Sequence, residues 1–430
     1  MKPGILAESQ KAIPLILLTG VLAVISIALG SLAQDLNPLY IVLMLGLIAG
    51  WLFYSGFNDF SLHGSLVLIA LSFIKPLLPG FFLLQLLLLF LILAELYRNR
   101  QLSLFVPYPV AFMLLFGFGI YGAMRIQNSL GYTYFFSTIL VPFIVLTLCQ
   151  NARITRDSLL LWMKAVVAVA AFVGAYGIYI AIRNPFDRLG SFWFTAMTIN
   201  GFYTLAFFFA LTLVLTAKEQ YQKAMYAVAA FLILFGMLYT YTRMAILAVA
   251  FGMFLLMIRV RAMRYLGIVL LALTPLIIPS SMISRIELGF NSDISLIIRA
   301  IAWYYSALQI WQNPFTGIGF GVWADWYYSV IPMRILYAQH AHNLYLNVLV
   351  EIGIIGGLAY FWIIYKSLRQ YWKHSITGNP DILHYGVWVS LMALLFACIT
   401  DIFIQQHSIS ILFWLSLGLV LAQTRITANE

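Results

Sequence analysis

The sequence predicts an all-α polytopic membrane protein in which residues 1–430 form a single integral membrane domain. Hydrophobic residues make up 63% of the 430 residues and charged residues only 9%, and the mean hydropathy is +0.97. Soluble domains carry about a quarter charged residues. Apolar runs of about 15 to 24 residues recur along the whole chain, and a transmembrane helix needs roughly 20. These runs leave no segment for a water-soluble domain.

The apolar runs predict twelve to fourteen transmembrane helices. The first run follows Lys2 and Lys11 and ends in Ser-Leu-Ala-Gln, which resembles a signal-peptide cleavage site. Its length and the spans behind it favour a retained first helix. Two short pairs, one joined by Leu78-Pro79-Gly80 and one around Arg243, leave the count open. The fourteen predicted spans are 12–33, 38–56, 63–79, 80–97, 106–124, 132–149, 158–181, 199–216, 225–241, 244–258, 265–279, 346–365, 383–403 and 407–424.

The basic residues predict the orientation. With an even number of spans, both termini lie on one side, and fifteen of the 24 lysines and arginines fall in the termini and the alternate loops on that side. Cytoplasmic loops of membrane proteins carry such an excess of positive charge, so both termini are expected in the cytoplasm. The net charge of +10 reflects these loops and does not indicate binding to nucleic acid.

The basic residues left for the outer face are all arginines. Lys75 and Lys164 lie near span ends, where lysine reaches the interface. Arginine binds carboxylate or phosphate oxygens through two hydrogen bonds, whereas lysine is a point charge. An anionic ligand would therefore explain positive charge on this side, although contact with lipid headgroups accounts equally well for Arg183, Arg285 and Arg334. The seven are Arg125, Arg183, Arg188, Arg243, Arg285, Arg299 and Arg334.

One predicted connection is long: the outer loop 279–345. Loops of roughly 65 residues are usually functional. Asn291-Ser292-Asp293 offers a helix N-cap and an Asn-Pro pair follows Gln312, so a helix near 293–312 is expected, with Arg299 and Trp303 on one face. The three glycines of FTGIGFGVW then predict a tight, close-packed turn. They are weak evidence for phosphate binding because no Gly-Lys-Ser/Thr follows.

The segment AQHAHNLYLNVLVEIGIIG, residues 338–356, is unusually polar for the start of a membrane span. If its helix begins near Asn343, then His340, Asn343, Asn347 and Glu351 form one stripe, which should face the bundle interior because polar groups facing lipid are costly. His342 lies off the stripe and is the candidate general base, since the pKa of an unperturbed histidine is about 6.5. The alternatives are a structural histidine at 340, a helix-capping histidine at 342 and a buried, orienting carboxyl at 351.

Arg243 is a second candidate. The run from Met225 to Ile258 contains no other charged residue, and Arg243 follows Tyr239-Thr240-Tyr241-Thr242 at its outer turn. With so little loop around it, a contact with an anionic ligand is favoured over a lipid-headgroup anchor. The loop DRLGSFWFTAMTING, residues 187–201, carries Arg188 and taken alone predicts only a connection.

Several kinds of site are not indicated. Two histidines without a carboxylate or thiolate at a recognised ligand spacing make a poor metal site, so no metal or other cofactor is expected. The cysteines, Cys149 and Cys398, fall in apolar runs and indicate neither a disulfide framework nor a nucleophile at the outer surface. Gly-x-Ser-x-Gly is absent. A glycosidase-type carboxylate pair stays possible, but nothing in the sequence brings two outer acids together.

Together these segments resemble the O-antigen ligase and polymerase superfamily of bacterial membrane glycan transferases, whose members usually have about twelve spans. The resemblance covers residues 188 to 356. Its elements are, in chain order, Arg188-Leu-Gly with Asn200, Thr242-Arg243, Arg299-x-x-x-Trp303 followed by Asn313-Pro314-Phe-Thr-Gly317-Ile-Gly319, and His340-Ala-His342-Asn343 leading to Glu351-x-Gly353-x-x-Gly356.

The resemblance implies a GT-C-like, inverting, metal-independent glycosyltransferase in the bacterial inner membrane, with its active site facing the periplasm. The implied donor is a glycan on undecaprenyl diphosphate. The acceptor is a sugar hydroxyl of lipid A-core in a ligase, or another lipid-linked repeat in a polymerase. A ligase is the favoured interpretation; a polymerase, a protein O-oligosaccharyltransferase and a lipid-linked glycan transporter are the alternatives. Transport is less favoured because no half-to-half sequence similarity is found.

The resemblance also implies residue roles. Arg243 and Arg299, with Arg188, would bind the donor diphosphate, and His342 would accept the proton of the acceptor hydroxyl. His340 and Asn343 would orient or bind, and Glu351 would support them. Membrane lipids are the other expected partners.

Overall fold

The computed structural model describes residues 105–151, 154–183, 198–265, 294–331, 338–377 and 381–429, with four isolated positions between them (267, 269, 333 and 336). Within these residues all regular structure is helical, and five helices are long and apolar enough to cross a membrane. The predicted class, an all-α polytopic membrane protein, is confirmed. The first four predicted spans and almost all of 265–279 lie outside the described residues, so the total number of spans stays a prediction.

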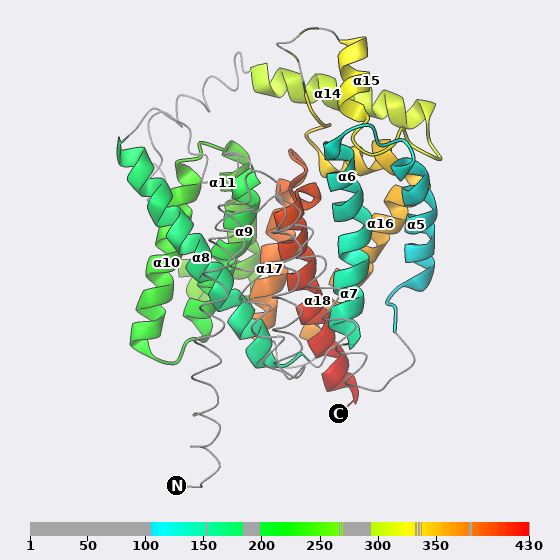
Figure 1. Cartoon of the computed structure of the whole chain (residues 1–430). Helices are drawn as coiled ribbons and strands as arrows, with labels where there is room; N and C mark the ends of the chain where they lie inside the picture. The colour runs from blue at the N-terminus through cyan, green and yellow to red at the C-terminus, as the bar shows by residue number, and fades with distance from the viewer. Residues whose placement is uncertain are drawn as a thin grey trace, which may run out of the picture.

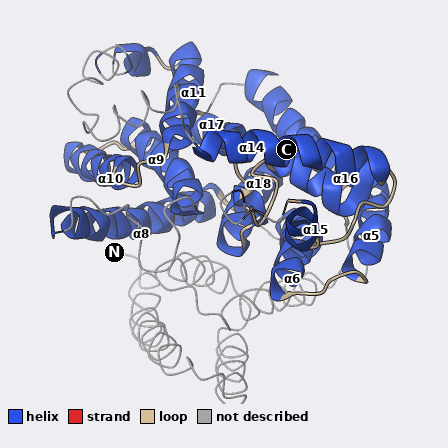
Figure 2. Cartoon of the chain, turned by 90° about the horizontal axis from the view of Figure 1, so that it is seen from above, coloured by secondary structure: helices blue, strands red, loops and turns tan. Residues whose placement is uncertain are grey.

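The long helices run between two ends of a bundle (Figure 1); α14 lies across one of these ends, and the short helix α15 stands on the same end. We refer to it as the α14 end. From above, α14 passes over the ends of α16 and α17 (Figure 2). The elements are α5 (Pro109–Ala123), α6 (Ser129–Phe135), a π-helical turn (Phe136–Leu140), α7 (Val141–Asn151), α8 (Arg156–Arg183), α9 (Thr198–Thr216), α10 (Gln220–Leu238), α11 (Arg243–Arg259), α14 (Ile294–Gln312), α15 (Trp323–Val330), α16 (Leu344–Thr377), α17 (Ile382–Ala397), a 3-10 turn (Phe403–Gln405) and α18 (His407–Asn429).

Hydropathy located most of these helices to within a few residues. The two short spans around Arg243 are distinct helices, α10 and α11, separated by the turn at 239–242. Two predicted spans need correction. The span 346–365 belongs to a longer, bent helix, and the span 383–403 is too long because α17 ends at Ala397. Residues 398–406 form a loop whose carbonyls and side chains bond to other elements, which a sum of local hydropathy cannot detect.

The core forms where α8, α10 and α17 surround α9, whose predicted span is the most completely buried of the five candidates. Small residues permit this close packing. A Cβ at Gly236 of α10 would lie 3.0 Å from the Cα of Gly174 in α8, and a Cβ at Gly386 of α17 would collide with Thr212 of α9. Close approach at small residues is the usual way membrane helices gain packing energy, since burial from lipid gives little.

A bend at Gly353 divides α16 into two helices. Gly353 has φ 72° and ψ 178°, a region of backbone conformation essentially restricted to glycine. Tyr345 and Phe361 consequently come into contact, with ring centroids 5.3 Å apart, whereas a straight helix would separate them by about 24 Å. The chain therefore turns sharply as it leaves the α14 end and enters the bundle.

The loop from Pro314 to Gly321 packs against this bend and satisfies its backbone groups. Ile354 N–H donates to Pro314 O at 2.7 Å, while Ile318 and Gly319 donate to the carbonyls of residues 350 and 351 at 2.8 and 3.0 Å. Gly317, Gly319 and Gly321 all have positive φ. A Cβ at Gly317 would lie 2.5 Å from Val350 O. The tight, close-packed glycine turn predicted from the sequence is thus present, and it locks the bend.

We expect Gly353→Ala to destabilise the protein strongly. Its backbone conformation costs a non-glycine residue on the order of 1–3 kcal/mol, and the added Cβ would also collide with the Phe315 carbonyl. Gly117→Ala in α5 is the matched control, because a Cβ there meets nothing within 4 Å. Thermal unfolding in detergent measures both variants. Equal melting temperatures for them would contradict a glycine-specific bend.

Candidate active site

Two loops meet beneath α14 at one end of the bundle: residues 338–343, which lead into α16, and residues 398–406, which join α17 to α18 (Figure 1). They bring together His340, His342 and Asp401, whose ligand atoms all lie within 4.8 Å of one another. His340 Nε2 is 3.9 Å from Asp401 Oδ1, and the two imidazole centroids are 4.3 Å apart. The cluster therefore combines two imidazoles with one carboxylate.

Backbone hydrogen bonds hold the two loops in register. Leu344 N–H donates to Cys398 O at 2.9 Å, and Tyr345 Oη donates to Leu395 O at 2.9 Å. The Asn343 side chain accepts from Leu346 N–H at 3.1 Å, so Asn343 caps the start of α16. The capping role considered for His342 is thus filled by its neighbour. His342 itself adopts a left-handed backbone conformation, with φ 47°.

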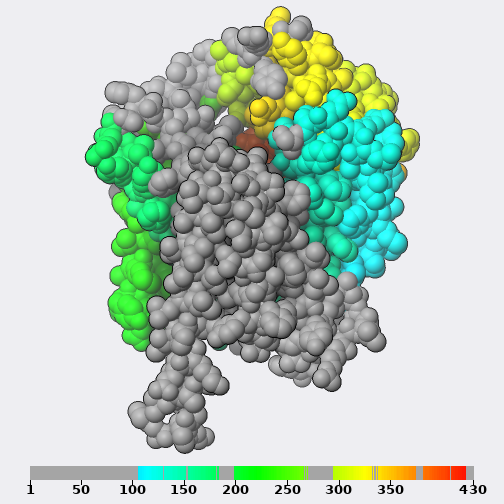
Figure 3. Space-filling view, viewed as in Figure 1, coloured from blue at the N-terminus to red at the C-terminus, as the bar shows by residue number. Residues whose placement is uncertain are grey.

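The helix α14 closes the cluster from above, and its residues cover the α14 end of the molecule together with α15 (yellow in Figure 3). Trp303 Nε1 donates to His342 O at 3.3 Å. Arg299 Nε donates to Thr400 O at 3.4 Å, and Arg299 Nη1 donates to Ser295 Oγ at 3.1 Å. Of these two residues, expected on one face of a helix, Trp303 contacts the loop 338–343 and Arg299 contacts the loop 398–406. One arginine and one tryptophan thereby form the roof of the site.

Burial keeps both imidazoles neutral. Burial, with a smaller contribution in the same direction from the nearby Arg299, lowers the pKa of His340 to about 4. Burial also lowers the pKa of His342 to about 3, helped by His340 and Arg299 and opposed by Asp401. The pKa of Arg299 is lowered by burial and raised by Asp401, but an arginine remains charged. At neutral pH the site holds one cation, one carboxylate and two uncharged imidazoles.

Hydrogen bonds fix the tautomer of His340. Its Nδ1 accepts from His342 N–H at 3.1 Å, so the proton of the neutral ring sits on Nε2, which faces Asp401. In His342, Nδ1 is buried and has no hydrogen-bond partner among the described residues. His340 is thus the orienting histidine of the pair, and His342 has a ring nitrogen still to be satisfied.

Asp401 was missed in the sequence because it lies inside the predicted span 383–403. A charge within an apolar run was nevertheless a usable signal, since such residues are costly and usually functional. The carboxylate supplies the third group that a metal site at His340 and His342 lacked. By distance these groups could hold an ion, yet the proton on His340 Nε2 occupies the position from which that ring would bind it. The expected absence of a metal stays a prediction.

The predicted polar stripe faces the interior of the protein. Asn347 and Glu351 are fully buried and Asn343 is 9% exposed. Gln405 links them: its Nε2 donates to Glu351 Oε2 at 2.7 Å and to Thr138 Oγ1 at 3.0 Å, and its Oε1 accepts from Asn347 Nδ2 at 2.8 Å. This agrees with the buried, orienting role considered for the Glu351 carboxyl.

The same network reaches two further segments: the loop 338–343, which we call the histidine loop, and the glycine turn at residues 317–321. Ala341 N–H, between the two histidines, donates to Asn347 Oδ1 at 3.1 Å. Gly321 N–H, at the end of the glycine turn, donates to Glu351 Oε1 at 3.3 Å. A continuous chain of hydrogen bonds therefore runs from the histidine loop through Asn347, Gln405 and Glu351 to the glycine turn, and the histidines rest on it.

Arg243 begins α11 at the α14 end. Its turn is tied to α9 by paired hydrogen bonds: Asn200 Nδ2 donates to Thr240 Oγ1 at 2.9 Å, and Thr240 Oγ1 lies 3.2 Å from Asn200 Oδ1. Asn200, which belongs to one element of the family resemblance, thus contacts the turn directly before Thr242-Arg243, which is another element. Because α11 packs along α17, which leads into the Asp401 loop, Arg243 shares an end of the bundle with the cluster. Whether its guanidinium reaches the cluster stays a prediction.

Two other arginines predicted on the outer face, Arg125 and Arg183, contact protein groups away from the histidine cluster. Arg125 donates to Tyr121 Oη at 2.7 Å and to Gly317 O at 3.5 Å, so it supports the glycine turn. Arg183 stacks over the Tyr179 ring at 4.6 Å. Arg188, Arg285 and Arg334 lie outside the described residues. The expected role of Arg188 therefore stays a prediction.

Comparison with known families agrees with this geometry. Residues 228–361 match the family model described as O-antigen ligase. This region is similar to the O-antigen ligase family. The match extends from α10 into α16 and includes Arg243, Arg299 and both histidines. It ends before Asp401 and Gln405, which complete the site from the C-terminal helices. No curated protein matches the chain.

This match confirms the resemblance to the ligase and polymerase superfamily. With the membrane-spanning helices, it supports a multi-pass bacterial membrane protein that has a glycosyltransferase-like activity of the O-antigen ligase or polymerase type. Such an activity uses a lipid-linked glycan and a glycan acceptor.

We expect Gln405→Leu to destabilise the protein by roughly 2–3 kcal/mol, because Asn347 and the Glu351 carboxyl would both lose a buried partner. Thr138→Val removes only one hydrogen bond to the same side chain and should cost less. Thermal unfolding in detergent compares the two. A smaller effect for Gln405→Leu than for Thr138→Val would show that the network does not hold the loops.

The histidine loop should weaken in acid. The folded pKa of His340, about 4, lies below the unfolded value of about 6.5, so the unfolded chain binds more protons between these values. The stabilisation is complete above about pH 6.5 and is lost as the pH falls toward 4, by up to about 3 kcal/mol. His340→Gln removes this titration, so its melting temperature should depend less on pH. Identical pH slopes for variant and wild type would contradict the buried neutral state.

Proposed function

We propose that this protein transfers a glycan from undecaprenyl diphosphate to a sugar hydroxyl of lipid A-core, with inversion at the anomeric carbon, on the periplasmic face of the bacterial inner membrane. The observation that carries the proposal is the neutral imidazole of His342 beneath Arg299 at one end of a membrane bundle. It combines a proton acceptor with a fixed cation where a lipid-anchored diphosphate would arrive.

In this mechanism the acceptor hydroxyl oxygen attacks the anomeric carbon as the bond to the diphosphate oxygen breaks. His342 takes the hydroxyl proton, and the electron pair of the broken bond leaves with the diphosphate. Negative charge therefore develops on the leaving group, and positive charge placed beside it lowers the barrier. Arg299 supplies that charge, with Arg243 and Arg188 as further diphosphate ligands. A single displacement inverts the anomeric configuration.

Donor binding would also strengthen the base. The positive charge of Arg299 is one reason why the pKa of His342 lies near 3. A diphosphate beside Arg299 offsets that charge and adds negative charge, so the pKa of His342 rises toward the range in which a general base works efficiently. The imidazole thus becomes an effective base only after the donor has arrived, which limits wasteful protonation in the empty site.

His340, Asp401 and Asn343 act as positioning residues. His340 accepts the backbone N–H of His342, Asp401 lies beside His340 and raises the pKa of His342, and Asn343 caps the helix that follows. The buried Glu351 carboxyl supports the loop that carries both histidines through Gln405 and Asn347, whose side chain accepts from Ala341 N–H. None of these roles requires a metal ion, in keeping with the proposed metal-independent reaction.

The distribution of basic residues supports the orientation. Arg125, Arg183, Arg243 and Arg299 lie at or near the α14 end, whereas Arg156, Arg259 and Lys373 lie at the opposite ends of their helices. Lys218 and Lys223 flank the start of α10 at that opposite end. Positive charge accumulates on the cytoplasmic side of membrane proteins, so the α14 end would face the periplasm.

A polymerase that joins lipid-linked repeats would use the same residues and differ in its acceptor. A protein O-oligosaccharyltransferase would differ in the same way. Transport of the lipid-linked glycan is less well supported, because transporter sites commonly lie at mid-membrane between repeated halves, whereas this cluster lies at one end of the bundle.

We expect purified protein, given an undecaprenyl-diphosphate-linked repeat, to modify lipid A-core and to form no product without it. A ladder of products without lipid A-core would instead identify a polymerase. Absence of product in both mixtures would contradict both transferase proposals and favour protein acceptors or transport. An identical reaction containing a chelator tests metal independence, since the cluster of two imidazoles and a carboxylate would be the group affected.

His342→Ala should lower the transfer rate by about 10²- to 10⁴-fold, the usual contribution of general base catalysis. Arg299→Lys keeps the charge but loses the planar fork, so a loss of about ten-fold is expected. His384→Ala, at the opposite end of the bundle, is the matched histidine control. Full transfer by His342→Ala at normal protein level would overturn the assignment.

A further inference from the structure

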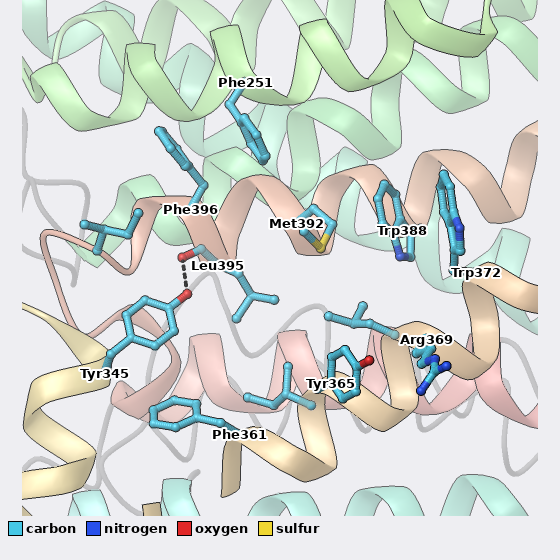
Figure 4. A pocket seen from close by; sticks show the side chains of 13 residues that line it. Phe251, Tyr345, Phe361, Tyr365, Arg369, Trp372, Trp388, Met392, Leu395 and Phe396 are labelled. Carbon is cyan, nitrogen blue, oxygen red and sulfur yellow. Dashed lines mark hydrogen bonds between the residues drawn. The ribbon is translucent and has the colours of Figure 1, made fainter. Parts of the chain in front are cut away.

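An apolar groove of about 650 Å³ lies between α16 and α17, with α11 at its side. Figure 4 shows Met392 of α17 facing Phe361 and Tyr365 of α16 across this space. Phe251 of α11 stacks on Phe396 with centroids 4.6 Å apart and forms one wall. Tyr365 is exposed, so the groove opens on the surface of the bundle, where lipid surrounds it. The volume falls within the roughly 300–1,000 Å³ typical of ligand pockets.

Two hydrogen bonds close the groove at the α14 end. Leu344 N–H donates to Cys398 O at 2.9 Å, and Tyr345 Oη donates to Leu395 O at 2.9 Å, as Figure 4 shows. They join the start of α16 to the end of α17 and separate the groove from Arg299. A molecule with a polar head can therefore lie in the groove only with its head at the opposite end.

The opposite end is aromatic and basic. Among the described residues that line the groove, Arg369 alone is charged, and Figure 4 shows it at the end where Trp372 and Trp388 lie. These two indole rings have centroids 4.7 Å apart, and Arg259 of α11 lies over Trp372 at 5.0 Å. Lys366 lies within one turn of Arg369 on α16. Tryptophan and basic residues are typical of the boundary between hydrocarbon and headgroups.

The positive charge at this end is not neutralised by nearby acids. Neither Arg369 nor Lys366 forms an ion pair with a residue that the structure describes. Asp381, which begins α17 at this end, is instead paired with Arg156 at 3.2 Å and with His384 at 3.1 Å. An anionic group that reached Arg369 would thus meet uncompensated positive charge.

The length of the groove matches one leaflet of a bilayer. From Phe361 to Trp372 the groove follows α16 for about 16 Å, and from Trp388 to Ile399 it follows α17 for the same length. One leaflet contributes about 15 Å of hydrocarbon. Water gains nothing from a site that lacks polar partners, and an empty crevice forfeits the dispersion contacts of its walls. The groove therefore suits a single acyl chain whose head lies at Arg369.

We infer that this groove binds an anionic glycerophospholipid, with one acyl chain between α16 and α17 and the phosphate at Arg369. Lys366 and Arg259 add positive charge around the headgroup, and each basic residue near a membrane surface strengthens the attraction of anionic lipid about five-fold. A zwitterionic headgroup carries an ammonium group that these residues repel. The site does not depend on the transfer reaction, and the proposed orientation places it in the cytoplasmic leaflet, away from the candidate active site.

The test measures lipid binding to purified, delipidated protein by native mass spectrometry. Phosphatidylglycerol is compared with phosphatidylethanolamine that carries the same acyl chains. The wild-type protein should bind phosphatidylglycerol at least five-fold more tightly. Arg369→Gln should weaken the binding of phosphatidylglycerol about five-fold and leave that of phosphatidylethanolamine unchanged. Lys218→Gln is the matched charge control, since Lys218 lies before α10 at the same end of the bundle but outside the groove, and it should change neither lipid.

A second variant tests the acyl chain. Met392→Trp fills the groove at its middle and should weaken the binding of phosphatidylglycerol five-fold or more. Met113→Trp on α5 is its control, because Met113 is 66% exposed and lies outside the groove. If Met392→Trp does not fold, phosphatidylglycerol with a diazirine in its acyl chain replaces it, and should label residues 361–372 and 388–399 of the wild-type protein.

Three outcomes would overturn the inference. The first is equal binding of the two phospholipids by the wild-type protein, and the second is the same affinity for phosphatidylglycerol in Arg369→Gln and Lys218→Gln. The third is tighter binding of undecaprenyl phosphate than of phosphatidylglycerol, lost in Met392→Trp, which would identify a polyprenyl chain as the occupant. Labelling confined to other segments would likewise reject the groove as the lipid site.

Discussion

The bend of α16 at Gly353 is the constraint on which the rest of this site depends. Its backbone conformation is open only to glycine, and the freed N–H and C=O groups are satisfied by the loop from Pro314 to Gly321. The bend places three things at one point. The histidine loop lies across the end of the bundle, the Glu351 carboxyl is buried against Gln405, and Tyr345 turns toward Phe361 to form the upper end of the apolar groove.

Buried polar side chains are concentrated at this end of the bundle, and most of them form hydrogen bonds with one another or with the backbone. The stripe from Asn343 to Glu351 would be costly against lipid, and a partner loop from the C-terminal helices satisfies it. Such a network has a second consequence, because it fixes the loop that carries His342 with little freedom to move. A rigid base beneath a fixed guanidinium is the arrangement that electrostatic catalysis requires, since the enzyme then spends no energy on reorganisation during the reaction.

The neutral state of the histidines follows from the same burial. A charged imidazole beside Arg299 in an apolar environment would be strongly disfavoured. The empty site therefore holds its positive charge on arginine alone, where protonation does not depend on pH. A single histidine cannot carry a permanent positive charge and accept a proton at the same time. Here Arg299 carries the charge and a neutral histidine is the proton acceptor.

Much of this could be predicted from residues that are close in the sequence. Hydropathy over about 20 residues marks a membrane span, so the helices from α5 to α11 and α18 were located. The spacing of three and four residues predicted that Asn347 and Glu351 share one inward face of a helix, and both are buried. The Asn-Pro pair after Gln312 predicted the end of α14. The resemblance of the histidine and arginine segments to a transferase superfamily was also available, and the family match bears it out.

The sequence by itself determined the membrane class, the positions of most of the described helices and several of the polar side chains of the site, because each is fixed by neighbours within a few turns of helix. Only the tertiary structure decided that Asp401 joins the histidines, that Gln405 supports Glu351 and that an apolar groove opens beneath them. Asp401 and Gln405 lie in a loop that hydropathy assigned in part to a span. Their roles depend on partners from distant helices, and a local pattern carries no record of which distant segments will meet.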